Sequence, residues 1–506
     1  MIRLRAIPER LQQSLIALVA GMALGAAFAP LAWWPLAMLS PAVLMQLWSR
    51  STPRRAAWLG FCYSFGTFSV GTYWLYVSIH VFGQAPVWMA LALMLGLVCI
   101  MALYYAALGH VIARWLPTHG VAGFLVAMPA AWLLVEWLRG WFLSGFGWLS
   151  LGYSQTDTWL AGFAPVGGSV LLSWLLLVGA GALSLLWQGS RRERVVAAIA
   201  LLLPWPIGWA LGRVEWTQVA GAPVDVAVLQ GAIPQDLKWL ENNRQATLDL
   251  YRDMTREALG TPLIVWPEAA APDLANNLIP YLRGLSAEAG AEGSSLVLGI
   301  LRAERDQKTR ETQYFNSVLG LGAEVAWYDK HHLVPFAEFF PVPKFVRGWL
   351  RLMSLPYSDF TRGGREQAPL RIAGLELAAS ICYEDAYPTT QLAVLDRATA
   401  LVNVTNDAWF GRSSARYQHL QISRLRAIEA RRFLIRAAND GVSAVIGPRG
   451  EIVARAAEYE RVVLRSAVVP RSGLPPYARV GNWPVILLCL ALVVVGVRLR
   501  RRVGRQ

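Results

Sequence analysis

LELAASICYEDAYP, residues 375–388, joins an apolar run to a cysteine, an aromatic residue and two acids. The apolar half predicts a β-strand, and Cys382 stands where that strand ends. The other cysteines, Cys62, Cys99 and Cys489, fall within predicted membrane spans, so Cys382 has no disulfide partner in its own domain. A purely structural core strand would not be expected to end in charged residues, and a solvated turn would not be expected to carry a thiol. The pattern therefore favours a nucleophile over the alternative, a small inert core cysteine.

The residues around this stretch predict a layered α/β domain. Between 222 and 470, short β-rich runs alternate with amphipathic helical patterns, as expected of sheets covered by helices. Two more polar residues stand at the ends of predicted strands: Glu268, in LIVWPEAA, and Lys330, in AWYDKHHLVPFAEFFP. Lysine is rare in this arginine-rich chain, so a lysine beside an apolar strand suggests that its compact ammonium is required. The alternative for Lys330 is a solvated hairpin residue.

These three side chains together offer the parts of nucleophilic catalysis. A free cysteine has a pKa of about 8.5, so a base or a cation has to supply the thiolate. A buried glutamate can accept the thiol proton, and an ammonium can stabilise the oxyanion that forms on attack. Histidine is the usual rival base, here His331, His332 or His419. The adjacent pair His331 and His332 also fits a metal site, but no further ligand cluster supports one, and we expect neither a metal nor another cofactor.

The rest of the chain predicts a membrane protein. Of its 506 residues, 55% are hydrophobic and 16% are charged, and the mean hydropathy of +0.38 is too high for a soluble protein of this length. A span takes about 20 apolar residues. Eight segments are suitable: near 12–29, 31–48, 57–78, 86–113, 122–141, 164–187, 194–212 and 482–498. We therefore predict a helical membrane domain at 1–212, a soluble domain at 213–481, and a last span with a basic tail at 482–506.

Arginines flank the predicted spans on alternate sides. If the N-terminus is cytoplasmic, the short outer loops hold only Arg139. Under the positive-inside rule, both termini are then cytoplasmic and the 213–481 domain lies on the opposite side. These arginine clusters account for much of the net charge of +14, so nucleic acid is not an expected partner. The first span resembles a signal peptide, but Pro30 directly after Ala27–Ala29 argues against cleavage. Glu136 and Arg139, three residues apart, are placed to pair on one helix face.

In order and spacing, WPE, YDKHHLVPFAEF and CYED resemble the Glu–Lys–Cys triad of the nitrilase superfamily. With the eight spans and VTNDAWFG, they resemble the bacterial apolipoprotein N-acyltransferases over essentially the whole chain. The resemblance implies an αββα sandwich for the soluble domain, with Glu268 as general base, Lys330 as oxyanion-stabilising cation and Cys382 as acylated nucleophile. It also implies supporting residues: Glu338, Glu384, and Tyr383, whose backbone N–H would serve the oxyanion hole. Ala337 departs from the glycine usual in the family.

The resemblance further implies a ping-pong acyltransferase of the bacterial inner membrane, which we expect to be a monomer. A phospholipid would acylate the cysteine, and the α-amine of the diacylglyceryl-cysteine of an apolipoprotein would then take the acyl chain as an amide. Because both substrates lie in the bilayer, we expect the apolar segment 339–360, with Trp349 and Leu350, to form a lid at the membrane interface, the alternative being a buried loop. Trp239 and Trp409 are expected to line the pocket or to be core residues. The alternative function is a membrane-tethered amidase of the nitrilase type, in which water replaces the amine.

Overall fold

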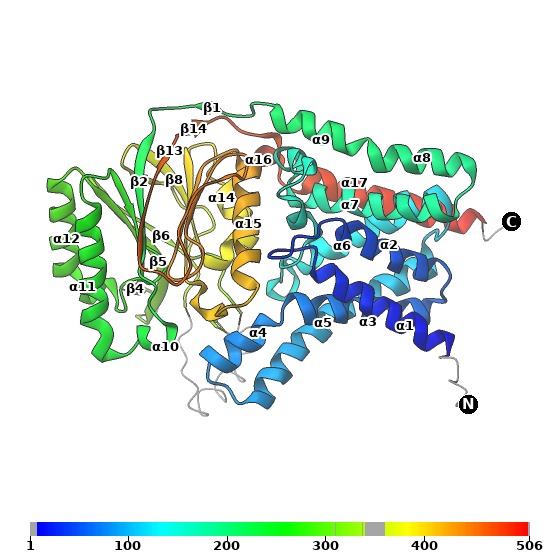
Figure 1. Ribbon diagram of the computed structural model, residues 1–506, viewed down its shortest axis with the longest axis horizontal. Helices are drawn as coiled ribbons and strands as arrows, with labels where there is room; N and C mark the ends of the chain where they lie inside the picture. Colours follow the sequence, from blue (N-terminus) through cyan, green and yellow to red (C-terminus); the bar gives the residue numbers. More distant parts are fainter. Residues whose placement is uncertain (1–7, 309, 336, 340–359, 504–506) are drawn as a thin grey trace. The chain divides into compact units, whose positions relative to one another are not determined.

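The computed structural model of the protein describes residues 8–308, 310–335, 337–339 and 360–503 (Figure 1). The chain forms two compact units. The helical unit comprises Met1–Val214, Arg412–Gln421 and Val480–Gln506, and the α/β unit comprises Glu215–Gly411 and Ile422–Arg479.

The helical unit is built from the apolar, lightly charged parts of the sequence. Its longer helices are α1 (Glu9–Gly25), α2 (Leu36–Ser49), α3 (Pro53–Gly71), α5 (Val87–Trp115), α6 (Met128–Arg139), α7 (Ala164–Gln188), α8 (Arg191–Leu202), α9 (Pro204–Arg213) and α17 (Trp483–Val503). Short helical turns join them: α4 (Trp74–Tyr76), η1 (Val77–Phe82), η2 (Ala122–Ala127), η3 (Phe142–Ser144), η4 (Leu151–Gln155) and η5 (Trp159–Phe163).

Five helical segments of the described chain are long and apolar enough to cross a membrane. They are Val87–Trp115, Ala122–Arg139, Trp159–Gln188, Arg191–Arg213 and Trp483–Arg502. Helix α2 is apolar but has only 14 residues. Helix α1 has 17 residues and begins with charged side chains, and α3 carries two arginines in its first turn. The protein is therefore a membrane protein with several apolar helices, and the predicted total of eight spans stays a prediction.

Glu136 and Arg139, expected to pair with each other, both bind the irregular segment that follows α6. Arg139 donates hydrogen bonds to the carbonyl oxygens of Phe146 and Trp148. Glu136 accepts from the backbone N–H of Leu151 and from the hydroxyl of Ser173. Both side chains are buried. They satisfy backbone groups in a stretch with little regular structure, a role expected of polar groups buried in a helical bundle.

The α/β unit contains two six-stranded sheets, ordered β13-β2-β3-β4-β5-β6 and β12-β11-β10-β9-β8-β7, and a two-stranded ribbon of β1 and β14. The strands are β1 (Gln218–Val219), β2 (Val224–Gln230), β3 (Leu263–Val265), β4 (Ser295–Arg305), β5 (Thr312–Leu321), β6 (Val325–Asp329), β7 (Leu370–Ile372), β8 (Leu375–Ile381), β9 (Ala400–Thr405), β10 (Leu434–Ala438), β11 (Ala444–Ile446), β12 (Ile452–Arg455), β13 (Val462–Val468) and β14 (Arg471–Ser472). Strands β2, β3 and β4 are parallel, as are β8, β9 and β10.

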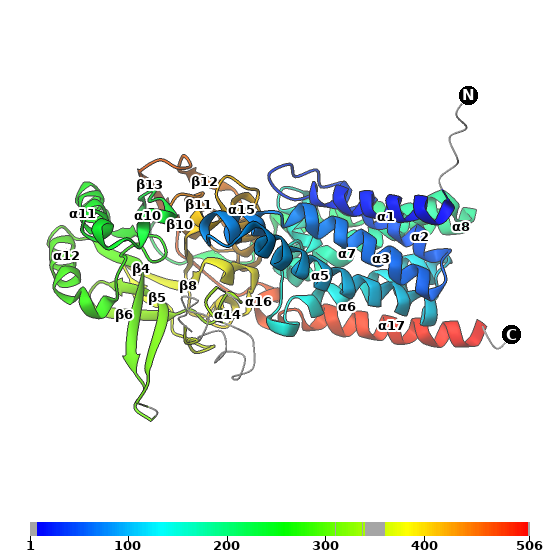
Figure 2. The same cartoon turned by 90° about the horizontal axis from the view of Figure 1, so that it is seen from below.

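Alternation along the strands separates the two faces of each sheet. On β2, Val226 and Val228 belong to the core between the sheets, whereas Ala227 and Leu229 belong to the core under the helices. The helices of this unit are α10 (Gln235–Lys238), α11 (Glu241–Ala258), α12 (Ile279–Ala291), α14 (Thr389–Leu392), α15 (Ala415–Ala430) and α16 (Pro476–Val480), with short turns η6 (Ala275–Asn277), η7 (Cys382–Ala386) and η8 (Asp407–Phe410). The first residues of α15, up to Gln421, are counted in the helical unit, and the last residue of α16, Val480, is counted there too. Helices α11 and α12 cover the first sheet (Figure 2). The expected α/β domain is present.

Candidate active site

Cys382 lies at the turn where strand β8 ends and helix η7 begins. Its φ of 51° falls in the left-handed region, which residues other than glycine seldom adopt. Asn403, on the neighbouring strand β9, donates from Nδ2 to the Cys382 carbonyl oxygen at 3.4 Å. Strained conformations of this kind persist only where the surroundings hold them, and they cluster at catalytic sites.

Glu268 follows strand β3 and is held by hydrogen bonds to both carboxylate oxygens. Its Oε1 accepts from Nδ2 of Asn316 at 2.7 Å, and its Oε2 accepts from the backbone N–H of Asn406 at 2.9 Å. The side chain is buried. Asn316 lies on β5, in the same sheet as β3, whereas Asn406 follows β9 of the other sheet. The orientation of the carboxylate therefore depends on both sheets.

Lys330 follows strand β6 and lies between two carboxylates. Its Nζ is 2.9 Å from Oε1 of Glu338 and 3.6 Å from Oε1 of Glu268, and the side chain is 1% exposed. Burial by itself lowers the pKa of a lysine, but the charges of Glu338 and Glu268 outweigh it and raise the pKa of Lys330 above its ordinary value. Lys330 is therefore a fixed positive charge at neutral pH.

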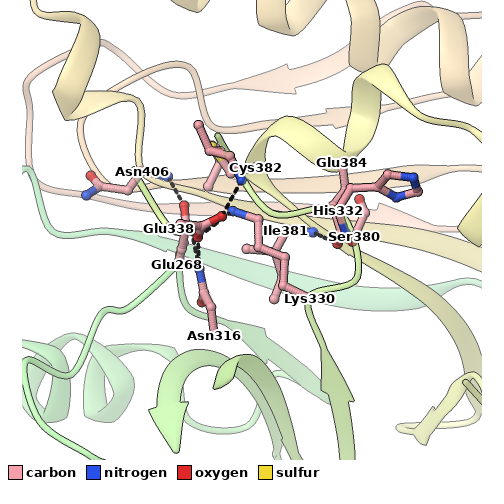
Figure 3. A network of polar contacts seen from close by, with 12 residues as sticks. Glu268, Asn316, Lys330, His332, Glu338, Ser380, Ile381, Cys382, Glu384 and Asn406 are labelled. Atoms are coloured by element: carbon pink, nitrogen blue, oxygen red, sulfur yellow. Dashed lines mark hydrogen bonds and ion pairs between the residues drawn. The ribbon is translucent and has the colours of Figure 1, made fainter. Parts of the chain in front are cut away.

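The Cys382 thiol lies in the field of these charges (Figure 3). Burial and the negative charge of Glu268 raise the pKa of the thiol, whereas the positive charge of Lys330 lowers it, and the net shift is upward. The resting side chain is thus a neutral thiol rather than a stored thiolate. Attack on a carbonyl then requires a base that takes the proton as the S–C bond forms.

Glu384 ties the loop after β6 to the turn that carries the cysteine. Its Oε1 accepts the backbone N–H groups of His331 and His332 at 2.8 and 2.9 Å. Its Oε2 accepts from the backbone N–H of Ile381 at 2.8 Å and from the Tyr328 hydroxyl at 2.9 Å. Burial raises the pKa of Glu384 to about 7. Glu384 therefore links the end of β6, which precedes Lys330, to the end of β8, which precedes Cys382. These two strands belong to different sheets.

The amino-acid sequence matches two protein families. Residues 20–183 match the apolipoprotein N-acyltransferase N-terminal domain, and residues 225–472 match the carbon-nitrogen hydrolase family. The apolipoprotein N-acyltransferase of Methylococcus capsulatus is 40% identical over 494 residues, which cover 96% of each chain. The chain belongs to the apolipoprotein N-acyltransferase family.

Two further comparisons agree with this family. The apolipoprotein N-acyltransferase of Azotobacter vinelandii is 41% identical and covers 97% of this chain and 95% of its own. That of Chromobacterium violaceum is 42% identical and covers 96% and 95%. The solved structure of Saccharomyces cerevisiae Nit3, a nitrilase superfamily member, covers 50% of this chain and 92% of its own, with 18% identity and a TM-score of 0.37. The family and the acyltransferase activity expected from the sequence are confirmed.

Most of the site residues expected from the sequence lie close together. Glu268, Lys330, Cys382 and Glu338 converge, and Glu384 supports the two segments beside them (Figure 3). The Tyr383 hydroxyl accepts a hydrogen bond from the Tyr387 hydroxyl at 3.0 Å. Trp239 is 48% exposed and Trp409 is 40% exposed, so neither is a core residue. Trp349 and Leu350 lie outside the described residues, as does most of the segment expected to form a lid.

The two histidines beside Lys330 make contacts outside the cluster of Glu268, Lys330 and Cys382. The His331 ring bonds through Nδ1 to the Gly363 carbonyl oxygen at 2.8 Å. The His332 ring stacks on Tyr387 with centroids 4.4 Å apart, and burial lowers its pKa to about 4. Among the described residues, no group of three or more His, Cys, Asp or Glu side chains is arranged to hold a metal ion.

Two residues that hydrogen-bond to Glu268, Asn316 and Lys238, were not predicted from the sequence. Asn316 interrupts the apolar strand β5, where its Nδ2 also donates to Oε1 of Glu338 at 3.0 Å. Lys238 is 1% exposed and donates from Nζ to the Glu268 carbonyl oxygen at 3.1 Å. The signal was present in both cases: a polar residue inside an apolar run, and a lysine in a chain that uses arginine almost everywhere else.

Alanine at Gly299 is expected to lower acyl transfer by about 10²-fold, because it displaces the carboxylate. A Cβ at Gly299, on strand β4, would lie 2.5 Å from Cα of Glu268 and 2.6 Å from the carbonyl oxygen of Pro267. These distances are too short for non-bonded atoms, so the backbone at Pro267 and Glu268 would have to move. Gly284→Ala, in helix α12, is the matched control, since its Cβ would meet nothing within 4 Å. Steady-state rates of both variants check this, and equal rates would contradict it.

Lys238→Met is expected to stabilise the fold at neutral pH. Burial, partly offset by Glu268 and Asp440, lowers the pKa of Lys238 from 10.5 to about 8. Below pH 8 the folded state therefore holds a buried charge that costs on the order of 3 kcal/mol relative to the unfolded chain. Between pH 8 and 10.5 the unfolded state binds more protons, so wild-type stability rises with pH.

The measurement is the melting temperature of wild type and Lys238→Met between pH 7 and 10. The advantage of the variant should shrink as the pH rises. A constant difference across this range would show that Lys238 does not titrate there. The acyl-transfer rate of the variant should fall, because the Glu268 carbonyl loses its donor.

Proposed function

We propose that this chain transfers a fatty acyl chain from a membrane phospholipid to the α-amine of the diacylglyceryl-cysteine of an apolipoprotein, through a thioester on Cys382. The observation that carries the proposal is the convergence of the Cys382 thiol with the Glu268 carboxylate and the Lys330 ammonium, whose charges both act on the pKa of the thiol. Glu268 is the general base and Lys330 the electrostatic stabiliser. The relatives named apolipoprotein N-acyltransferase support the choice of donor and acceptor.

In the first half-reaction, Glu268 accepts the thiol proton while the sulfur attacks the ester carbonyl carbon. The negative charge that develops on the carbonyl oxygen is balanced by the Lys330 ammonium and by the backbone N–H of Tyr383. The C–O bond then breaks, the proton on Glu268 passes to the departing oxygen, and lysophospholipid leaves. An acyl thioester on Cys382 remains.

In the second half-reaction, the acceptor amine attacks the thioester carbonyl. Glu268 takes a proton from the attacking nitrogen and returns it to the departing sulfur, so the enzyme ends in its starting state. The product amide is more stable than the thioester, so transfer runs downhill. Asn316 and the Asn406 N–H hold the carboxylate through both steps, and Glu338 keeps Lys330 in place.

The test is to mix the purified protein with phospholipid labelled in its acyl chain and to analyse the Cys382 peptide by mass spectrometry. We expect a hydroxylamine-labile acyl group on Cys382, which disappears when a synthetic diacylglyceryl lipopeptide is added and reappears on its α-amine. Release as free fatty acid instead would favour the amidase-like hydrolase. Absence of any acyl-enzyme would reject the mechanism.

For the membrane domain we propose eight spans, cytoplasmic termini and a periplasmic catalytic domain at 213–481, in a monomer of the inner membrane. The alternating arginine clusters support this topology. A cysteine introduced at exposed Lys308 should react with a membrane-impermeant maleimide in spheroplasts. A cysteine introduced at exposed Arg191 should react only after the membrane is permeabilised. The opposite pattern would reverse the topology.

A further inference from the structure

A buried ring of hydrogen bonds lies directly behind the turn that carries Cys382. It starts from three residues in register on adjacent strands: Ser380 on β8 faces Asn403 on β9, which faces Arg436 on β10. All three are completely buried. Each is a polar residue in an otherwise apolar strand, and none of the three has a role in the mechanism proposed above.

The ring closes through two further buried residues. Asn403 Nδ2 donates to Ser380 Oγ at 3.0 Å, and Ser380 Oγ donates to Oδ1 of Asp385 at 2.9 Å. Ser423, on α15, donates to the other oxygen of Asp385. Arg436 Nη1 then donates to Ser423 Oγ at 2.9 Å and to Asn403 Oδ1 at 3.0 Å. Each group in the ring acts in a consistent donor or acceptor role.

This ring brackets the strained cysteine. Ser380 lies two residues before Cys382 and Asp385 lies three residues after it, so their hydrogen bond clamps the two sides of the turn. Asn403 adds the bond to the Cys382 carbonyl oxygen. A left-handed conformation at a non-glycine residue is unfavourable and needs such external support.

Arg436 also balances a carboxylate that acts on the sulfur. Its Nη2 is 2.7 Å from Oδ2 of Asp407, and its Nη1 is 3.7 Å from Oδ2 of Asp385. The charge of Asp407 raises the pKa of the Cys382 thiol. Thr405 connects Asp407 to the cysteine: its hydroxyl donates to Oδ1 of Asp407 at 3.1 Å and is hydrogen-bonded to the Cys382 side chain.

We propose that Arg436 is a positioning residue for acyl transfer, which fixes the Cys382 turn through the buried ring and neutralises Asp407 so that the sulfur can lose its proton. It touches no substrate. Substitution of Arg436 leaves the other charged groups around the thiol in the protein. They are Glu268 after β3, Lys330 after β6, Glu338 in the loop that follows Lys330, and Glu384 on η7.

The test compares Cys382 alkylation by iodoacetamide as a function of pH, followed on the Cys382 peptide by mass spectrometry. Arg436→Met should leave Asp407 unbalanced, so alkylation at about pH 7 should slow by about tenfold and its midpoint should rise by about one pH unit. Acyl-enzyme formation should slow in parallel. Arg436→Met combined with Asp407→Asn removes one charge of each sign and should return the midpoint close to that of wild type.

A purely structural role predicts a different result. If Arg436 only stabilised the fold, the second substitution would not restore the midpoint. Arg432→Met is the matched control: Arg432 is equally buried, and among the residues that the structure describes it donates to the carbonyl oxygens of Ala398, Ala430, Arg431 and Gly473. It should lower the melting temperature without moving the midpoint.

If Arg436→Met does not fold, Asp407→Asn alone decides the question. It removes a negative charge near the sulfur, so the midpoint should fall and alkylation at about pH 7 should become several-fold faster. An unchanged midpoint in this variant would overturn the proposal.

Discussion

Cys382→Ser is expected to lower acyl transfer by about 10⁴-fold or more. Serine keeps the size of the side chain and the strained φ of 51°, so the fold should be unaffected. The hydroxyl, however, is far less acidic than a thiol, and a glutamate is too weak a base to ionise it. The measurements are the steady-state rate and the amount of acyl-enzyme trapped from labelled phospholipid, which should be undetectable.

Cys99→Ser is the control, because this free cysteine lies in helix α5 of the helical unit. It should keep the wild-type rate and the wild-type acyl-enzyme. A Cys382→Ser protein that retained more than about a tenth of the activity would show that another group carries the acyl chain. The melting temperature should be equal in the two variants, which separates loss of chemistry from loss of structure.

Lys330→Met is expected to lower the rate by about 10³-fold, with a change in pH dependence. Removal of the ammonium takes away the charge that balances the oxyanion in the proposed mechanism. It also leaves Glu268 and Glu338 sharing the Nδ2 of Asn316, at 2.7 and 3.0 Å, with no cation between them. Two carboxylates so placed cannot both stay ionised easily, so the residual activity should require a higher pH than in wild type.

A second substitution separates the two effects of Lys330. Glu338→Gln in the Lys330→Met background removes the repulsion, so the pH profile should return towards wild type while the rate stays low. Lys308→Met, at an exposed position in a hairpin, should change neither. A double variant whose rate recovered fully would mean that the ammonium only balances Glu338 and does not stabilise the transition state.

Several parts of the fold could be predicted from the sequence. The end of β8 at Ile381, the end of β3 two residues before Pro267, and the end of β6 at Asp329 follow from short apolar runs. All of β3 and most of β8 are buried. Each run is read locally, because side chains on a strand alternate between its two faces. The family could be predicted as well, since its motifs lie within short stretches around Glu268, Lys330 and Cys382.

Other parts were less accessible. The predicted spans near 12–29 and 57–78 correspond to helices α1 and α3, whose composition is less apolar than that of α5 or α7. Asn316, Lys238 and Arg436 were overlooked because a single polar residue in a strand or short helix has no local pattern to mark its partner. The partners Glu268, Glu268 and Asn403 lie 48, 30 and 33 residues away along the chain.

The sequence by itself determined the strands, their polar ends and the family, because these depend on local apolar periodicity and on short motifs. Only the tertiary structure decided that a carboxylate from β3, an ammonium from β6 and a thiol from β8 share one buried site. Pairing between strands far apart in the chain sets that geometry, and burial then makes each charge act on the others. The ring behind the cysteine has the same origin, since Ser380, Asn403 and Arg436 become neighbours only through strand register.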